Sequence, residues 1–292
     1  MKRPKSILVV VERTTDSSVL LRKAIGLAKS LGAQLELFLC DSEQAYVLGH
    51  TYDREGVMAA RSASISAARR YLSVLRDSAP DDVEMSIDAE CESPLYESVV
   101  RKVLRSAPEV VVKAVGEAGA RKAGSPNPND WQLMRICPVT LMLTRSRAWR
   151  DPPRFAAAID VSDAEPEDLA RSVMETAVLL ADAFRAELQV VYGERDSRGE
   201  ARERLEKLRR LCAEAGVVQD RKHVLPGEPE RALPVFLREQ GYDALVLGAL
   251  AHRSSGITPV GTLTSTLLDT LDCDFVLVKP PSYRSPIQNA IA

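Results

Sequence analysis

Histidines, paired cysteines and long apolar runs are scarce in this chain of 292 residues. The five cysteines are scattered without a CxxC pair, and only three histidines accompany them. This spacing predicts no metal site and favours reduced, buried thiols. No apolar run approaches the length of a transmembrane helix, and the run over residues 7–11 is too short for a signal-peptide core. By elimination, these absences predict a cytoplasmic protein.

An excess of positive charge is also lacking. Lysine and arginine number 39 against 41 aspartates and glutamates, and the formal net charge is -2. This balance argues against a general nucleic-acid surface. A phosphate loop with its lysine, a Ser-His-Asp arrangement and a nucleophile elbow are all missing from the sequence. We therefore predict no catalytic residues and, at most, a slow reaction.

The sequence does contain a repeat, in which the same order of strands and helices is expected in each half. In each half, short apolar runs alternate with segments of helical periodicity, and the order begins and ends with a strand. Buried runs separated by helix-length crossovers indicate neighbouring parallel strands. We predict an α/β protein of two tandem, doubly wound, open parallel five-stranded sheets, over residues 1–147 and 153–292. Residues 41–56 are expected to be irregular.

The strongest candidate for a binding site lies near the carboxyl terminus. A buried strand ends at Gly248, a turn-rich segment covers residues 249–260, and a helix begins at Gly261-Thr262. The end of this strand and the start of this helix share the carboxyl edge of the sheet, where ligands bind in open α/β sheets. Gly261 would let a polyanion approach the backbone, and the hydroxyls of Thr262 and Thr264 lie where the helix dipole favours negative charge. Without further context, an ordinary turn with a helix cap is the favoured explanation of Gly261-Thr262.

The spacing in this segment resembles the nucleotide loop of the universal stress protein family. That loop is glycine, two residues, glycine, nine residues, then glycine followed by serine or threonine. Gly248, Ala251 and Gly261-Thr262 fall at these positions, with alanine in place of the second glycine. In the first half, the string Pro-x-Asp-Trp-x-Leu-x-Arg over residues 128–135 is similar to the first domain of tandem members of the E type.

The resemblance implies the universal stress protein fold, related to the adenine nucleotide alpha hydrolases, a role in stress response, and ATP as ligand of the second half. Magnesium is expected only as the ion that accompanies the nucleotide. Asp160, at the end of that half's first strand, would hold the adenosine part. The other family positions fall on Leu247 and Gly248 beside adenine and ribose, and on Gly261, Thr262 and Thr264 at the phosphates. The methyl group of Ala251 leaves weakened or absent ATP binding open.

The first half departs from the family pattern. Glu12 stands at the acidic position, but no glycine-threonine pair follows Gly116, and Trp131 falls near where phosphates would lie in the second half. We therefore expect a filled or reshaped pocket there. The resemblance also implies that the last strands, 139–143 and 275–278, meet within the chain as an internal pseudo-dimer. Homodimerisation of the whole chain stays open.

A structural or carrier module is the competing reading. In this reading, aromatic and aliphatic residues over 46–58 line an apolar cleft that holds a lipid-like ligand, and no nucleotide binds. The identity of a co-purifying small molecule, lipid or nucleotide, separates the two readings.

Overall fold

The computed structural model describes residues 3–13, 17–51, 53–115, 127–162, 167–194, 201–253, 256–259 and 262–288. Within these residues, one ten-stranded, mostly parallel sheet runs through the molecule in the order β3-β2-β1-β4-β5-β12-β9-β6-β7-β8. The first half contributes β1 (Ser6–Val10), β2 (Gln34–Cys40), β3 (Met85–Glu90), β4 (Val110–Ala114) and β5 (Thr140–Thr144). The second half contributes β6 (Arg154–Ala158), β7 (Glu187–Glu194), β8 (Lys222–Pro226), β9 (Ala244–Gly248) and β12 (Asp274–Val278).

Helices connect these strands in both halves. The first half contains α1 (Ser17–Leu31), α2 (Ser42–Gly49), α3 (Arg54–Asp77), α4 (Leu95–Ser106) and α5 (Pro128–Ile136). The second half contains α6 (Glu167–Phe184), α7 (Ala201–Glu214), the short 3-10 helix η1 (Gln219–Arg221), α8 (Pro229–Gln240) and α9 (Thr262–Thr270). In the described part of the chain, none of these helices combines the length and the apolar character needed to cross a bilayer.

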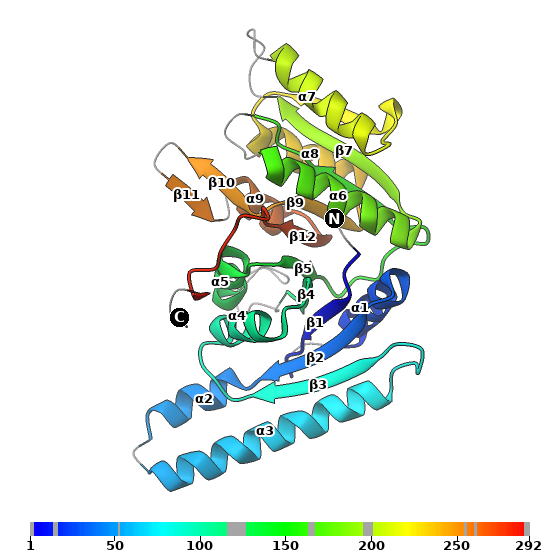
Figure 1. Ribbon diagram of the computed structural model, residues 1–292. Coiled ribbons are helices and arrows are strands. Elements are labelled where there is room, and N and C mark those ends of the chain that lie inside the picture. The colour runs from blue at the N-terminus through cyan, green and yellow to red at the C-terminus, as the bar shows by residue number, and fades with distance from the viewer. Residues whose placement is uncertain are drawn as a thin grey trace.

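The two halves join through their last strands. β5 and β12 pair antiparallel, with Leu143 opposite Phe275 and Leu141 opposite Leu277. The predicted α/β fold and the predicted meeting of the last strands are therefore confirmed, although the two expected sheets form one continuous sheet (Figure 1). Because this single pair is antiparallel, the carboxyl edges of the two halves face opposite ends of the sheet. The exact domain limits stay a prediction.

Two apolar layers cover the faces of the sheet. Strand residues of alternating direction, such as Val9 and Val10, enter different layers because successive side chains of a strand point to opposite faces. One layer is closed by α1, α3, α6 and α7, and the other by α4, α5, α8 and α9. The halves therefore share both layers.

The expectation of an irregular segment over residues 41–56 was wrong. Most of it is helical, because two aspartates cap the starts of helices: Asp41 accepts from the Gln44 amide and Asp53 from the Gly56 amide, each at 3.2 Å. The resulting pair of helices, α2 and α3, extends past the sheet at one end of the molecule (Figure 1).

The turn-rich segment over 249–260 was also misjudged. Its described residues form an antiparallel hairpin of β10 (Leu250–Arg253) and β11 (Gly256–Pro259), which contacts α5 of the first half. The four-residue runs are too short, and too close to glycine and proline, for sequence periodicity to indicate strands.

Candidate functional site

The second half has a topological switch point between β6 and β9. From these neighbours the chain order runs outwards in opposite directions, and the carboxyl ends at such a point are where open α/β sheets bind ligands. Ala158 pairs with Leu247 across the two strands, so Asp160 and Gly248 follow their strands at the same edge. α9 begins at this edge too, because it leads into β12, which is parallel to β9. The fold therefore brings the ends of β6 and β9 and the start of α9 to one edge.

The predicted site residues differ in exposure at this edge. Asp160 is exposed, and one of its carboxylate oxygens accepts the Ser162 amide at 2.8 Å. Gly248 is partly exposed, whereas the side chains of Leu247 and Thr264 are buried. Gly261 lies outside the described residues. Of Ala251 and Thr262, the structure describes only the backbone, in β10 and at the start of α9.

A polar cluster beside Asp160 was missed by sequence reasoning. Arg204 of α7 pairs with Glu194 at the end of β7, with Nη2 2.8 Å from Oε1, and the Tyr192 hydroxyl donates to Glu194 Oε2 at 3.2 Å. Burial and the Glu194 charge raise the pKa of Tyr192, so its hydroxyl remains a donor. β7 is the strand next to β6, so this cluster borders the edge on which Asp160 lies.

The corresponding edge of the first half is closed by an ion cluster. Lys113, the fourth residue of β4, is 1% exposed, and its ammonium lies 2.8 Å from Oδ1 of Asp130 and forms a second ion pair with Glu12. Asp130 is 0% exposed and also accepts the Asn127 amide in the capping box that starts α5. Burial alone lowers the pKa of Lys113, but the two carboxylates outweigh it and the pKa is raised.

Each member of this cluster has a counterpart in the second half. Strand registers place Lys113 where Leu247 stands, and Glu12 where Asp160 stands. Asp130 is the third residue of α5, as Thr264 is of α9. The expected filling of the first-half pocket is therefore carried by Lys113 and its partners, while Trp131 packs, partly buried, against the apolar layer. The signal in the sequence was a lysine within an otherwise apolar strand, which requires a buried partner.

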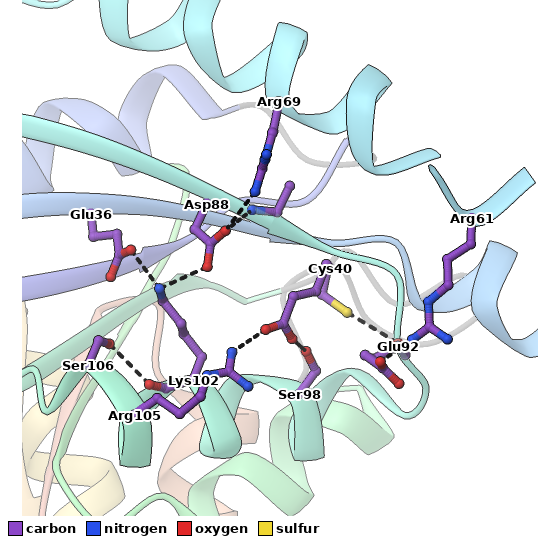
Figure 2. Close-up of polar contacts among 12 residues, drawn as sticks. Glu36, Cys40, Arg61, Arg69, Asp88, Glu92, Ser98, Lys102, Arg105 and Ser106 are labelled. Carbon is purple, nitrogen blue, oxygen red and sulfur yellow. Dashed lines mark hydrogen bonds and ion pairs between the residues drawn. The ribbon is translucent and has the colours of Figure 1, made fainter. Parts of the chain in front are cut away.

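Ion pairs also hold the outer part of the first half. Lys102 of α4 lies between Glu36 of β2 and Asp88 of β3, with its ammonium 2.6 and 2.9 Å from their oxygens (Figure 2). Burial lowers the pKa of Lys102, but both carboxylates outweigh this effect and the pKa is raised. On either side of Lys102 in the helix, Ser98 and Arg105 both bind Glu90. α4 is thus fixed to the edge strands by charge.

A cavity of about 370 Å³ lies between α2, α3 and the segment after β3. Tyr46, Leu48 and Val57 supply apolar lining, and the Arg61–Glu92 ion pair lies at its side (Figure 2). The side chain of Tyr46 is 63% exposed, so the cavity is accessible from solvent. This volume lies at the lower end of the range for small-molecule sites.

Comparisons with known proteins agree with this architecture. Residues 151–279 match the model of the universal stress protein family. The chain is 23% identical to universal stress protein E of Escherichia coli (strain K12), over 97% of this chain and 96% of the relative. The structure of a putative universal stress protein from Pseudomonas aeruginosa UCBPP-PA14 has a TM-score of 0.76 at 22% identity, covering 96% of this chain and 95% of that one. A protein of unknown function from Pseudomonas aeruginosa PAO1 gives a TM-score of 0.75 at 21% identity, covering 96% and 94%.

Proposed function

Because this chain is a homologue of universal stress protein E with a universal stress protein domain in its second half, we propose that the second half binds an adenine nucleotide. ATP is the expected ligand, and the bound state would serve a stress response. Magnesium would enter with the nucleotide phosphates.

The contrast between the two switch points carries this proposal. At the first, a buried lysine is neutralised by Glu12 and Asp130 and fills the edge. At the second, the equivalent positions are Leu247, the exposed Asp160 and Thr264, and the edge carries no such ion cluster among its described residues. An edge with the exposed Asp160 carboxylate and a helix start suits a ligand that has hydroxyls at one end and phosphates at the other.

Each part of the edge has a distinct role in this proposal. The Asp160 carboxylate accepts hydrogen bonds from ribose hydroxyls through the oxygen that is not bound to the Ser162 amide. The backbone around Leu247 and Gly248 borders the base and ribose, since the Leu247 side chain is buried. By the family resemblance, Gly261, Thr262 and Thr264 would belong to the phosphate end, where backbone amides at the start of α9 would bind the phosphates. Ala251 brings one methyl group to the loop between them.

Calorimetric titration with ATP tests the proposal with a matched pair of isosteric variants. Asp160→Asn removes the charge at the second switch point, and Glu12→Gln removes it at the first. We expect Asp160→Asn to weaken ATP binding by about tenfold, as for the loss of a charged hydrogen bond, and Glu12→Gln to leave it unchanged. Absence of binding heat in the wild-type protein, or equal losses in both variants, would contradict nucleotide binding at this edge.

The role of Ala251 is tested separately. If its methyl group hinders the loop, Ala251→Gly binds ATP more tightly than the wild type in the same titration. Equal affinities would show that the alanine is tolerated there.

The cavity beside α2 favours a second function, the binding of a hydrophobic, lipid-like ligand. The exposed Tyr46 lines this cavity together with Leu48 and Val57, and exposed apolar side chains of this kind can receive an apolar molecule. Mass spectrometry of a denaturing extract would reveal a lipid in this case, and Leu48→Glu should abolish its retention. An extract that holds nucleotide but no lipid opposes this second function.

A further inference from the structure

Each half ends its last strand with a cation that reaches across to the other half. Arg145 follows β5 in the first half, and Lys279 follows β12 in the second. Because β5 and β12 are antiparallel, the end of each strand lies beside the helix that precedes its partner. Figure 1 shows the carboxyl-terminal segment, in red, passing beside α5.

Both cations cap a helix of the opposite half. Arg145 Nη2 donates to the carbonyls of Leu268 and Leu271, at the end of α9, at 2.7 and 3.3 Å. Lys279 Nζ donates to the carbonyls of Met134 and Arg135, in the last turn of α5, at 2.8 and 3.3 Å. Carbonyls in a last helical turn lack partners within the helix, and a cation there also complements the dipole.

The two caps differ in one contact. Lys279 Nζ also donates to the carbonyl of Ala249 at 3.3 Å, whereas both carbonyls that the Arg145 side chain binds within the described residues lie at the end of α9. Ala249 follows Gly248 and leads directly into the β10–β11 hairpin, which itself contacts α5. One ammonium therefore joins the end of a first-half helix to the start of the second-half loop.

The surroundings of Lys279 favour a bridging role over an ion pair. Its residue is 8% exposed, and the titratable groups that face it are the Cys137 thiol before β5 and the Tyr283 hydroxyl of the carboxyl-terminal segment. Tyr283 places its ring 4.8 Å from the ammonium and donates its hydroxyl to the Arg135 carbonyl at 2.6 Å. The donors of the ammonium are thus directed to main-chain carbonyls of two halves, which fixes backbone positions.

We propose that Lys279 is a positioning residue for the nucleotide loop, through which α5 of the first half holds the entrance of the second-half site. The ligand part of this inference depends on the proposed nucleotide binding, but the mechanical part does not. The first half, whose own edge is closed, then contributes a fixed support to the edge that is open.

Amide hydrogen exchange without nucleotide tests the mechanical part. In Lys279→Met, we expect protection to fall roughly tenfold both at the end of α5 and over residues 249–253, since both lose their shared donor. Lys279→Arg should restore most of this protection. The matched control Arg145→Met should lower protection at the end of α9 and leave residues 249–253 unchanged. Exchange over β2 reports any general loss of stability.

Titration with ATP tests the ligand part in the same variants. We expect a loss of about tenfold in affinity for Lys279→Met, recovery in Lys279→Arg and little change in Arg145→Met. If exchange behaves as expected but the wild type binds no ATP, the proposed function fails and the coupling stands. If residues 249–253 keep their protection in Lys279→Met, or lose it equally in Arg145→Met, the coupling is wrong.

Discussion

The carboxyl edges of the two halves have the same arrangement of strands and helix but different side chains. The first half satisfies its edge internally, with Lys113 bound by Glu12 and Asp130. The second half has an apolar Leu247 and an exposed Asp160 at the matching positions. The difference teaches that residues at three matched positions give equivalent strand and helix ends different chemistry.

The helices α4 and α8, which occupy matching places in the two halves, also differ in the charge of their contacts. α4 is fixed by charge, with Lys102 between Glu36 and Asp88. In α8 the matching position is Phe236, whose ring lies 4.9 Å from the ring of His223. At this helix position, the first half therefore has ion pairs where the second half has a contact between two rings.

The largest expected effect comes from removing the lysine of the sealed edge. Lys113→Leu installs the second-half residue and leaves Asp130 buried without its cation, so we expect a loss of about 3 to 5 kcal/mol in the free energy of unfolding. The double variant Lys113→Leu with Asp130→Thr should recover most of this loss, because the buried carboxylate is removed as well. Denaturant unfolding measures both. A single variant within about 1 kcal/mol of the wild type would show that the cluster is not needed for stability.

The second prediction concerns how Lys279, one of the two cations that reach across to the other half, makes the free energy of unfolding depend on pH. Burial lowers the pKa of Lys279 to about 8, whereas an unfolded lysine titrates near 10.4. Between these values the unfolded chain holds more protons, so the contribution of Lys279 to the free energy of unfolding rises with pH. Relative to Lys279→Met, the wild type should gain about 2 to 3 kcal/mol from pH 7 to pH 10. Subtracting the free energy of unfolding of Lys279→Met from that of the wild type removes the contribution of the buried cysteines, which both proteins share. If this subtracted value stays constant between pH 7 and pH 10, the prediction is wrong.

A third prediction transfers the seal to the second half. Leu247→Lys with Thr264→Asp reproduces the Lys113–Asp130 pair beside Asp160, so ATP affinity should fall by about tenfold or more while the fold persists. Calorimetric titration measures the loss, and Leu247→Met serves as the control for a change of side-chain shape. Unchanged affinity in the double variant would place the nucleotide elsewhere.

The smallest effect is expected at the outer helix. Lys102→Met leaves Glu36 and Asp88 without their cation, but both carboxylates are partly exposed and regain water, so the loss should be about 1 kcal/mol. This loss should be smaller at high salt, because screening weakens the ion pairs of Lys102 in the wild type. Phe236→Leu in α8 is the matched control, and its effect should not depend on salt. Equal salt dependence in both variants would remove the distinction between the helices.

The sequence predicted those parts of the molecule that depend on local pattern. The apolar runs of β1, β4 and β9 and the glycine spacing after β9 are local, and they predicted the parallel sheet and the edge that Gly248 shares with α9. The ion cluster was not predicted, because Glu12, Lys113 and Asp130 are far apart in the chain and only the fold brings them together. α2 was missed because its residues have little amphipathic pattern and its start depends on one capping carboxylate, Asp41.

The antiparallel seam between β5 and β12 has a consequence for how such a chain changes over time. In an assembly of two identical subunits, every replacement is made twice, so a lysine that blocks one crevice blocks both. Covalent connection of the copies lifts that constraint, and each copy accumulates its own replacements. One gene then encodes a fixed one-to-one pairing of two halves with different edges, which no mixture of free subunits guarantees.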